Sequence, residues 1–485
     1  MKLYSENENY KLYQGNMLDM LDAINPSSID SIITDPPYEL NFMGKGWDNS
    51  GIAFQKETWQ KCYEVLKPGG YLLAFGGSRT FHRIACAIED AGFEIRDTIM
   101  WLYGSGFPKS MAIDKSIEGK LTTGSGNTRD FHKLNGEVED KGNYGYATMK
   151  FQQGDRPRDY NYESESSKRL AKLEPTTELA KKYSGWGTAL KPSFEPIIVA
   201  RKPFKGSLVD NVIEYGVGGI NIDECRVGNE TIKPSSNYKF NSKSDGINLY
   251  NFGKKDAQRI PANEHIGRFP ANTILTYDET DLDEVCGGFP NTKSTPRTPT
   301  KGGTGGVGQA TNFQRGSETS YFNDSGSAAR YFYCAKASKK DRDEGLDIFE
   351  EKNGVDITGR KENSNGLTWD GGKYAYGNAF AGAGSPKKNT HPTVKPTELM
   401  QYLVRLVSPN DATILDPFNG SGSTGKAVMY ENRERNKNYK YIGIELTEEY
   451  LPISKARIEY VCNLEPEKDM QMTIFDFIGE EDAIN

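Results

Sequence analysis

The chain has 485 residues, a formal net charge of −7, and 36% hydrophobic and 26% charged residues, a composition that suits a globular protein with long polar loops. No run approaches the ~18 apolar residues of a membrane span, and the six cysteines form no C-x-x-C pair, so the sequence predicts no membrane helix, metal site or disulfide framework. The first ten residues, MKLYSENENY, lack the basic and apolar pattern of a signal peptide, and we expect a cytoplasmic protein.

The first hundred residues alternate between apolar runs and helical patterns. Three apolar runs predict strands, at residues 28–34, 71–77 and 95–103. A turn-like segment, LKPGG at 66–70, introduces the second run. Residues 54–66 and 79–93 have the spacing of helices with one apolar face. Strand, helix, strand, helix and strand in succession predict a parallel α/β sheet.

An acid, two prolines and an aromatic residue follow the first predicted strand as Asp35, Pro36, Pro37 and Tyr38. The prolines fix the backbone and remove amide donors, which favours a rigid turn. Taken alone, the motif fits either a simple turn or a site where the acid and the tyrosine hold a group between them.

The middle of the chain is irregular. The periodic pattern dissolves from about 111 to 185, returns as one strand at 194–203, and is weak again from 226 to 385, apart from short runs at 272–277 and 329–336. Eight lysines and arginines against two acids between residues 291 and 340 give a local charge of +6, which could contact nucleic-acid phosphates or simply be solvated. Phe194 could stack on a base or belong to the core.

Order returns with ATILDPFNGSGSTGKA, which predicts a strand, a glycine turn and a helix. Gly420, Gly422 and Gly425 have G-x-G-x-x-G spacing, and Glu445 ends the next predicted strand, 23 residues past Gly422. This arrangement predicts a nucleoside-containing ligand, with the acid accepting hydrogen bonds from ribose hydroxyls. Asp416 precedes the loop; it would repel a pyrophosphate but favour a sulfonium amino acid, so S-adenosylmethionine is preferred over a nicotinamide dinucleotide.

Taken together, the motifs resemble the DNA amino-methyltransferases. DPPY (35–38) resembles their catalytic motif, DPFNGSG (416–422) their cofactor motif, and HPTVKP (391–396) the segment that closes over methionine. The order of these motifs is typical of the permuted β group, and the chain resembles phage or prophage members of it. The resemblance implies an α/β fold: a Rossmann-like class I methyltransferase sheet, circularly permuted, with a long irregular target-recognition insertion.

The resemblance also divides the chain. The expected parts are a catalytic half (1–110), a polar insertion (111–190), a return to the catalytic sheet (191–225), a target-recognition region (226–385), a cofactor-binding half (386–462) and an acidic tail (463–485). The family usually has Gly-Asp near the N-terminus, where the acid contacts the adenine of the cofactor. Here Asn16 follows Gly15, and its side-chain oxygen could still accept that bond.

Two sets of site residues follow from this resemblance. The implied catalytic residues are Asp35, Pro36, Pro37 and Tyr38. The implied cofactor-binding residues are Asn16, Asp35, His391, Thr393, Lys395, Asp416, Phe418, Asn419, Gly420, Ser421, Gly422 and Glu445. A base flipped out of a DNA duplex would stack on Tyr38, while the Asp35 carboxylate and the Pro36 carbonyl would each accept one hydrogen of its amino group.

The preferred target is adenine N6, because DPPY is commoner among adenine enzymes; cytosine N4 is the closest alternative. An RNA or protein methyltransferase and a nicotinamide-dependent dehydrogenase are more distant alternatives. The expected partner is double-stranded DNA, and a homodimer is a further hypothesis. In the tail, Gln471–Phe475 (QMTIF) resembles peptides that dock on the replication sliding clamp; the alternative is that its apolar side chains pack back on the sheet.

Overall fold

The computed structural model describes residues 2–40, 50–103, 110–124, 175–232, 237–239, 258–260, 264–277, 291–293, 325–327, 332–336, 339–352, 369–370, 373–374 and 387–465. The clamp-like peptide Gln471–Phe475 lies outside these residues, as do four of the eight basic residues between 291 and 340, namely Arg297, Lys301, Arg315 and Arg330. The predictions made for both segments therefore stay predictions.

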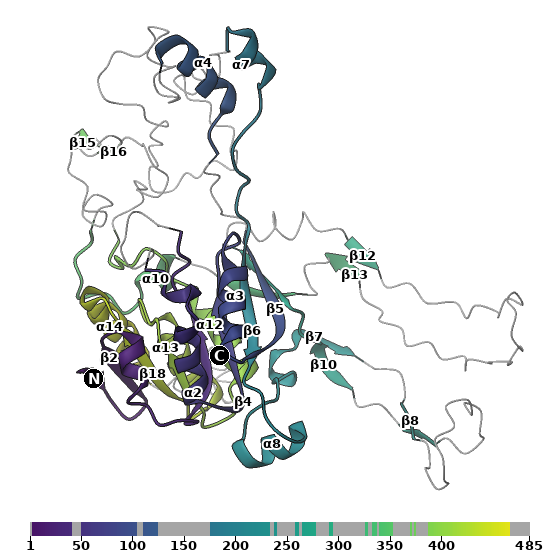
Figure 1. Ribbon diagram of the computed structural model, residues 1–485. Helices are drawn as coiled ribbons and strands as arrows, with labels where there is room; N and C mark the ends of the chain where they lie inside the picture. The colour runs from purple at the N-terminus through teal and green to yellow at the C-terminus, as the bar shows by residue number, and fades with distance from the viewer. Residues whose placement is uncertain are drawn as a thin grey trace, which may run out of the picture.

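A ten-stranded sheet forms the centre of the protein (Figure 1). In spatial order its strands are β1 (Lys2–Glu6), β2 (Tyr10–Gln14), β18 (Lys440–Glu445), β17 (Thr413–Asp416), β3 (Ile29–Thr34), β4 (Leu66–Phe75), β6 (Phe194–Arg201), β5 (Glu94–Tyr103), β11 (Thr273–Tyr277) and β14 (Tyr333–Lys336). Strands from the two ends of the chain meet at β3 and β17, which pair in parallel. The α/β fold expected from the sequence is confirmed as a Rossmann-like sheet.

The parallel sheet predicted from the sequence is correct for five neighbouring strands, from β2 to β4. No direction was predicted for the strand at 194–203; β6 runs antiparallel to both β4 and β5, so β4 and β5 themselves run in the same direction, as predicted. β6 is the next strand of this sheet after β5 in the chain and reverses beside it, a connection that needs no crossover helix and so leaves no βαβ signature in the sequence. LKPGG is also not a separate turn, because residues 66–70 already belong to β4.

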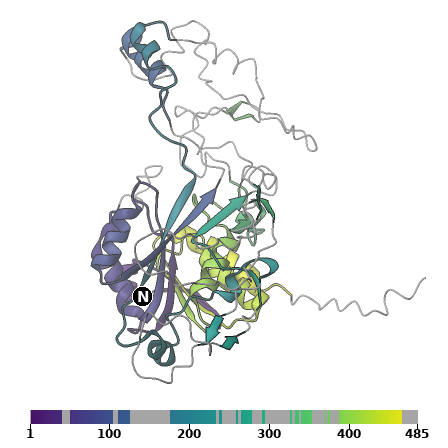
Figure 2. The same cartoon turned by 90° about the vertical axis from the view of Figure 1, so that its right-hand side faces the viewer.

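Helices cover both faces of the sheet. The first face carries α1 (Met17–Leu21), α2 (Lys56–Val65) and α3 (Phe81–Asp90); the second carries α12 (Thr397–Val407), α13 (Ser423–Arg435) and α14 (Leu451–Cys462). Figure 2 shows the purple N-terminal helices on one side of the strands and the green and yellow C-terminal helices on the other. Central strands therefore have both faces buried, and all six residues of β3 are buried, including the polar side chains of Asp30, Ser31 and Thr34.

Each face has its own core. Trp59 of α2, Ile84 of α3 and Ile32 of β3 belong to the first, whereas Ile33 of β3 and Leu403 of α12 belong to the second. Consecutive residues of β3 thus point into opposite cores. Among the described residues, no helix is long and apolar enough to span a membrane, and no group of His, Cys, Asp and Glu side chains could hold a metal ion.

Two regions expected to be irregular contain regular structure. Within the predicted polar insertion, α4 (Ile113–Thr123) and α7 (Glu178–Lys182) pair beyond the ends of β5 and β6 (Figures 1 and 2). Within the predicted target-recognition region, β11 and β14 extend the main sheet. Also in this region, α10 (Lys339–Asp343) packs on the cofactor-binding half, because Lys426 of α13 donates to the Asp341 carboxylate at 2.7 Å. Order on this side of the sheet therefore begins well before residue 386.

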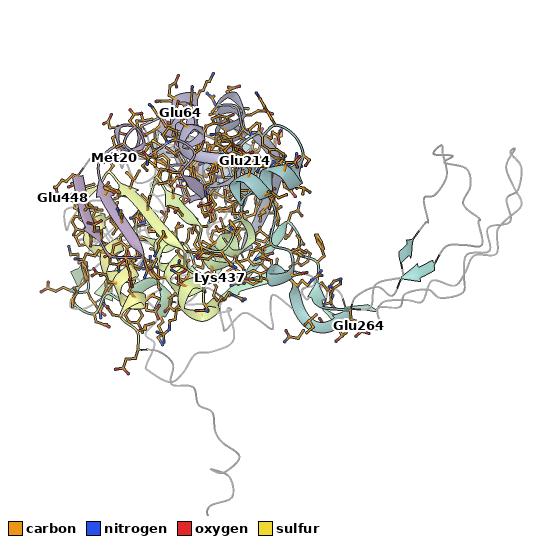
Figure 3. The ribbon with its side chains drawn as sticks, turned by 90° about the horizontal axis from the view of Figure 1, so that it is seen from below. Met20, Glu64, Glu214, Glu264, Lys437 and Glu448 are labelled. Carbon is orange, nitrogen blue, oxygen red and sulfur yellow. The ribbon has the colours of Figure 1, made fainter. Side chains whose placement is uncertain are left out.

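Smaller elements lie around this body. They are α8 (Leu208–Tyr215), the antiparallel pair β7 (Val227–Ile232) and β10 (His265–Arg268), the ribbons β8 (Asn237–Lys239) with β9 (Gln258–Ile260), β12 (Asn291–Lys293) with β13 (Ser325–Ser327) and β15 (Trp369–Asp370) with β16 (Lys373–Tyr374), and the short turns η3 (Ile52–Phe54), η4 (Asp223–Cys225) and η6 (Glu448–Tyr450). Figure 3 shows Glu264, at the start of β10, on a ribbon that projects away from the sheet, whereas Glu64 and Glu214 lie on the main body.

Candidate active site

The two sequence motifs meet at one edge of the sheet. β3 ends at Thr34 and leads into Asp35, and its neighbour β17 ends at Asp416 and leads into the glycine loop. Because the two strands are parallel and paired, their carboxyl ends open on the same side. The Thr34 hydroxyl donates to Asp416 Oδ1 at 2.7 Å and ties the two strand ends together. Segments more than 380 residues apart in the chain thus form one site.

The glycine loop has a backbone that side chains would disturb. Gly420 and Gly422 have φ angles of +51° and +74°, in the left-handed region that favours glycine. A Cβ atom on Gly422 would lie 2.5 Å from the Ser454 hydroxyl, and one on Gly420 would lie 3.0 Å from His391 Nε2. The loop can therefore lie close to α14 and to the segment around residue 391 only because both positions are glycine.

Glu445, at the end of β18, is held beside the glycine loop. Its Oε2 accepts from the Gly420 amide and its Oε1 from the Thr447 amide, both at 2.7 Å, and the side chain is 8% exposed. Burial raises the pKa of this carboxyl, although the backbone amides oppose the shift. Since each carboxylate oxygen has a second lone pair, the group can still accept hydrogen bonds from a ligand.

Asp416 is turned into the protein. Its Oδ1 accepts from the Thr34 hydroxyl and from the Phe418 amide, and its Oδ2 accepts from the Thr424 hydroxyl at 2.7 Å. Burial of this side chain raises its pKa to about 6, against these hydrogen bonds. The visible role of Asp416 is to fasten β17 to β3 and α13, and the contact with a cationic ligand expected from the sequence stays a prediction.

Asn419 and Ser421 also have internal partners. The Asn419 amide group donates to the Ser454 hydroxyl at 2.9 Å and accepts from the Tyr441 hydroxyl at 2.8 Å. Ser421 accepts through its carbonyl, at 2.9 Å, and its hydroxyl from the guanidinium of Arg457, which is completely buried. These two loop side chains set the shape of the loop, whereas Phe418 is half-buried.

The segment 391–396 covers the glycine loop. His391 is buried against Gly420, its ring lies 4.5 Å from that of Tyr450, and its Nδ1 lies 3.0 Å from the Thr393 carbonyl oxygen. Burial lowers the pKa of His391 to about 3, so the ring is neutral at physiological pH. Thr393 itself is exposed. Arg342 of α10 donates to the carbonyl oxygens of Asn389 and His391 and holds the segment from behind.

Lys395 lies at the catalytic motif, although we expected it at the cofactor. Its Nζ is 2.7 Å from Asp35 Oδ2 and 3.4 Å from Glu195 Oε2, and the side chain is 7% exposed. Burial opposes the charge of Lys395, but the two carboxylates outweigh it and raise the pKa of the amine. The amine also lies 5.3 Å from the centre of the Tyr38 ring. The segment 391–396 thus contacts both the glycine loop and the catalytic acid.

Asp35 uses only one of its oxygens. Oδ2 accepts from Lys395, whereas Oδ1 is buried and has no hydrogen-bond partner among the described residues. A buried carboxylate oxygen without a donor is costly, so this atom is a place where a ligand's N–H would be stabilised. The Tyr38 hydroxyl donates to Glu195 Oε2 at 2.8 Å, which fixes the ring beside Asp35. Pro36 is buried and Pro37 is half-buried.

Asn16 caps the first helix. Its side chain accepts from the Leu18 amide at 3.0 Å, and it is exposed. Gly15 donates through its amide to the Glu445 carbonyl, which places Asn16 next to the glycine-loop side of the site. A contact of Asn16 with adenine would have to use the second lone pair of the capping oxygen.

Three charged residues of this region were not predicted from the sequence: Glu195, Arg342 and Arg457. Glu195 follows Phe194, which was the residue considered there. A carboxylate at the start of an otherwise apolar strand is unusual and was the available signal. Arg457 sits in a helix with no distinguishing pattern, and the sequence carries no sign that its guanidinium reaches the glycine loop.

Comparisons with known proteins bear on this site. A family model described as a DNA methylase matches residues 29–456. The type II methyltransferase M2.LlaDCHI of Lactococcus lactis subsp. cremoris is 26% identical over 242 residues, which cover 45% of this chain and 82% of that protein. The type II methyltransferase M2.MboI of Moraxella bovis is 40% identical over 115 residues, covering 20% of this chain and 42% of that protein.

Two solved structures are similar over most of the chain. The PvuII DNA methyltransferase, described as cytosine-N4-specific, is 12% identical with a TM-score of 0.35 and covers 93% of this chain and 86% of its own. The complex of M1.HpyAVI with SAM is 13% identical with a TM-score of 0.31 and covers 93% and 99%.

Proposed function

The chain belongs to the DNA methylase family, and we propose that it methylates adenine N6 within a specific DNA sequence, using a base flipped out of the duplex. Members of this family methylate DNA, and this protein is a site-specific DNA methyltransferase that takes its methyl group from S-adenosylmethionine. The observation that carries the amino-group target is Asp35 Oδ1, a buried acceptor that has no partner within the described part of the chain and lies beside a fixed tyrosine ring.

The residues at the catalytic motif suit an amino group. Asp35 Oδ1 accepts one of its hydrogens and the Pro36 carbonyl accepts the other, which turns the nitrogen lone pair toward the methyl donor. The Tyr38 ring stacks on the base, a contact that contributes roughly 1–3 kcal/mol. The chain's contribution is then mainly positioning and electrostatic stabilisation, with no side chain needed as a strong base.

The glycine loop suits the methyl donor. We assign three roles at the methyl donor. Glu445 binds the ribose hydroxyls, Gly420 and Gly422 let the ligand lie close to the backbone, and Asn16 contacts the adenine. His391 and Thr393 cover the methionine part. Since His391 is neutral, it does not repel the sulfonium.

Adenine is preferred over cytosine because the motif begins with aspartate, as in the adenine enzymes that DPPY resembles. Cytosine N4 is the second candidate, since its exocyclic amino group offers the same two hydrogens to Asp35 and Pro36. An RNA or protein substrate is disfavoured by membership in the DNA methylase family.

A transfer assay tests this function. The full chain is incubated with tritiated S-adenosylmethionine and unmethylated genomic DNA, and the DNA is then digested to nucleosides. We expect label in N6-methyladenine. Label only in N4-methylcytosine would overturn the choice of base, and label in neither would overturn the proposed function. Modification-sensitive sequencing of the product gives the recognition sequence.

Double-stranded DNA is the partner that the family implies, and we place the reaction in the cytoplasm, where that DNA would be. A homodimer and a sliding clamp bound through Gln471–Phe475 remain hypotheses. A synthetic peptide of residues 466–480 titrated into the host clamp tests the second, with Ile474→Ala and Phe475→Ala together as control. No binding at high micromolar concentration, or equal binding by both peptides, would reject it.

A further inference from the structure

The surroundings of Asp35, called the corner below, contain charged groups to which the proposed reaction assigns no role. Three charged groups meet there: the Asp35 carboxylate, the Lys395 amine and the Glu195 carboxylate. Lys395 is almost completely enclosed, and the two carboxylates are each 20% exposed. Enclosed charges at such distances are costly unless each has a partner, so the arrangement calls for a reason beyond packing.

Lys395 fixes the orientation of Asp35. At 2.7 Å its amine holds Oδ2, which leaves Oδ1 as an acceptor that no described residue uses. Three aromatic rings surround the amine, with centroids at 4.9 Å (Phe75), 5.3 Å (Tyr38) and 5.9 Å (Trp101). Their faces stabilise the cation and leave its side chain little room to turn away.

Glu195 holds both Lys395 and Tyr38. Its Oε2 lies 3.4 Å from Lys395 Nζ and accepts from the Tyr38 hydroxyl at 2.8 Å; the Tyr103 hydroxyl lies 3.5 Å from Oε1. Its charge also matters. With Lys395 alone, the Asp35 carboxylate would be neutralised; with Glu195 added, the corner keeps one net negative charge.

We propose that Lys395 and Glu195 are positioning residues for Asp35: Lys395 fixes one oxygen and offsets the repulsion between the two carboxylates, and Glu195 leaves the corner with one net negative charge. This inference rests on the proposed function. In the transfer step the amino lone pair forms the N–C bond, and the C–S bonding pair goes to sulfur, which becomes a neutral thioether. The nitrogen becomes positively charged and then releases one proton to water, so a net negative corner stabilises the transition state.

Two matched variants separate these roles. Glu195→Gln keeps an oxygen for the Tyr38 hydroxyl but removes the negative charge, and we expect single-turnover transfer to slow by about 10- to 100-fold at an effective dielectric constant near 20. The affinity for S-adenosylmethionine, measured by calorimetry, should not change. Glu94→Gln is the control, because Glu94 pairs with Arg201 on the neighbouring strands and is far more exposed, at 42%.

Lys395→Met should produce a new pH dependence. Without the amine, Asp35 and Glu195 repel each other and share a proton, so the transfer rate should rise with pH relative to wild type. Among the described residues, the other titratable groups facing this corner are Tyr38, Tyr103, Asp416 and His391, and all are present in every variant. Burial raises the pKa of Tyr38 well above its ordinary value and that of Tyr103 to about 12, so neither ionises near neutral pH.

The double variant Lys395→Met with Glu195→Gln gives the sharpest test. It removes the repulsion and restores one net negative charge, so it should be faster than Lys395→Met alone and should regain the wild-type pH profile. A merely structural role predicts a double variant no faster than the slower single variant. Wild-type rates in Glu195→Gln, or a wild-type pH profile in Lys395→Met, would overturn the proposal.

The controls keep the outcomes distinct. Thermal melting checks folding, and if Lys395→Met does not fold, Glu195→Gln against Glu94→Gln decides the question. The substrate is unmethylated genomic DNA, and wild-type transfer is measured first. Absence of transfer by the wild type would count against the proposed function, whereas wild-type transfer with unaffected variants would count only against this inference.

Discussion

The glycine loop after β17 and the DPPY turn after β3 lie side by side, but the protein holds them differently. In the loop, Asp416, Asn419 and Ser421 all use their hydrogen-bonding capacity on other parts of the chain. In the turn, Asp35 Oδ1 is buried and accepts no hydrogen bond from any residue that the structure describes. The protein itself supplies the hydrogen-bond partners of the loop side chains, whereas the turn offers an acceptor that a ligand could use.

This difference predicts how the two regions respond to substitution. Changes in the turn should affect chemistry and leave binding of the methyl donor intact, whereas changes in the loop should affect folding or donor binding first. The variants below are ordered by the size of the effect that this comparison predicts.

Asp35→Ala should have the largest effect. It removes the acceptor for the target amino group, and we expect methyl transfer to fall by at least about 1000-fold. Binding of S-adenosylmethionine should be retained, because the contacts of Glu445 and the glycine loop are untouched. Calorimetry and the tritium assay on the same preparation check both points. Asp22→Ala, which removes an exposed partner of Lys61, is the control and should keep full activity.

Gly422→Ala should cost about 2–4 kcal/mol of unfolding free energy, because it adds both backbone strain and a steric clash with Ser454. Gly216→Ala is a matched control: its φ of +75° is nearly the same as the +74° of Gly422, but its Cβ would meet no atom within 4 Å. It should cost only about 1 kcal/mol. Urea denaturation of both variants measures the difference. Equal losses would mean that the close approach of the loop to α14 contributes nothing.

Glu445→Gln should weaken S-adenosylmethionine binding by about 10- to 100-fold, the range expected when charge-assisted hydrogen bonds to ribose are removed. Its effect on DNA binding should be much smaller. Glu448→Gln, an exposed acid three residues further along (Figure 3), is the control. If calorimetry gives Glu445→Gln the wild-type affinity, the ribose assignment is wrong.

His391 should make the free energy of unfolding of the protein fall in acid. Burial lowers its folded-state pKa to about 3, while in the unfolded chain it titrates near its ordinary value, so its contribution to stability is complete above about pH 6.5 and is lost as the pH falls toward 3. The contribution of Asp416 to the pH dependence of stability has the opposite sign, because its raised pKa favours the folded state in acid. Asp416 is present in all the proteins compared, so this contribution cancels in the comparison.

His391→Gln should therefore lose less stability than wild type between pH 7.5 and pH 5. The difference should approach about 1.4 kcal/mol for each pH unit below 6.5. Urea unfolding at the two pH values measures it. His82→Gln, at an exposed position on α3, should follow the wild type. A parallel loss in His391→Gln would show that the buried ring does not govern acid stability.

The sequence was enough to predict that the two motifs lie at one site. It was not enough to predict the side-chain contacts that join them to other segments. Each motif has a local signature, strand then acid then turn, and parallel strands carry such turns to one edge. The Lys395–Asp35 pair joins residues 360 positions apart, and neither residue's neighbours reveal the other. The direction of β6, and with it the place of Glu195, also has no local signature. Side-chain partners that come from distant segments could therefore not be predicted from the sequence.

The smallest effect should come from the basic residues on α10, which belong to neither the loop nor the turn. Lys340 is exposed, and Asp341 beside it fastens the helix to Lys426 of α13. If this helix contacts the DNA backbone, Lys339→Glu with Lys340→Glu should weaken binding to every sequence alike.

The slope of the logarithm of the binding constant against the logarithm of the salt concentration would then become shallower by about 0.9 for each phosphate that the helix no longer neutralises. The total change would be less than about 2. Lys205→Glu is the control, since this exposed lysine precedes α8, which lies far from α10 (Figure 1). Fluorescence anisotropy at several salt concentrations measures affinity and slope together. Because the change is remote from Asp35, the single-turnover rate at saturating DNA should stay at the wild-type value. An unchanged slope would mean that the basic pair is only solvated surface.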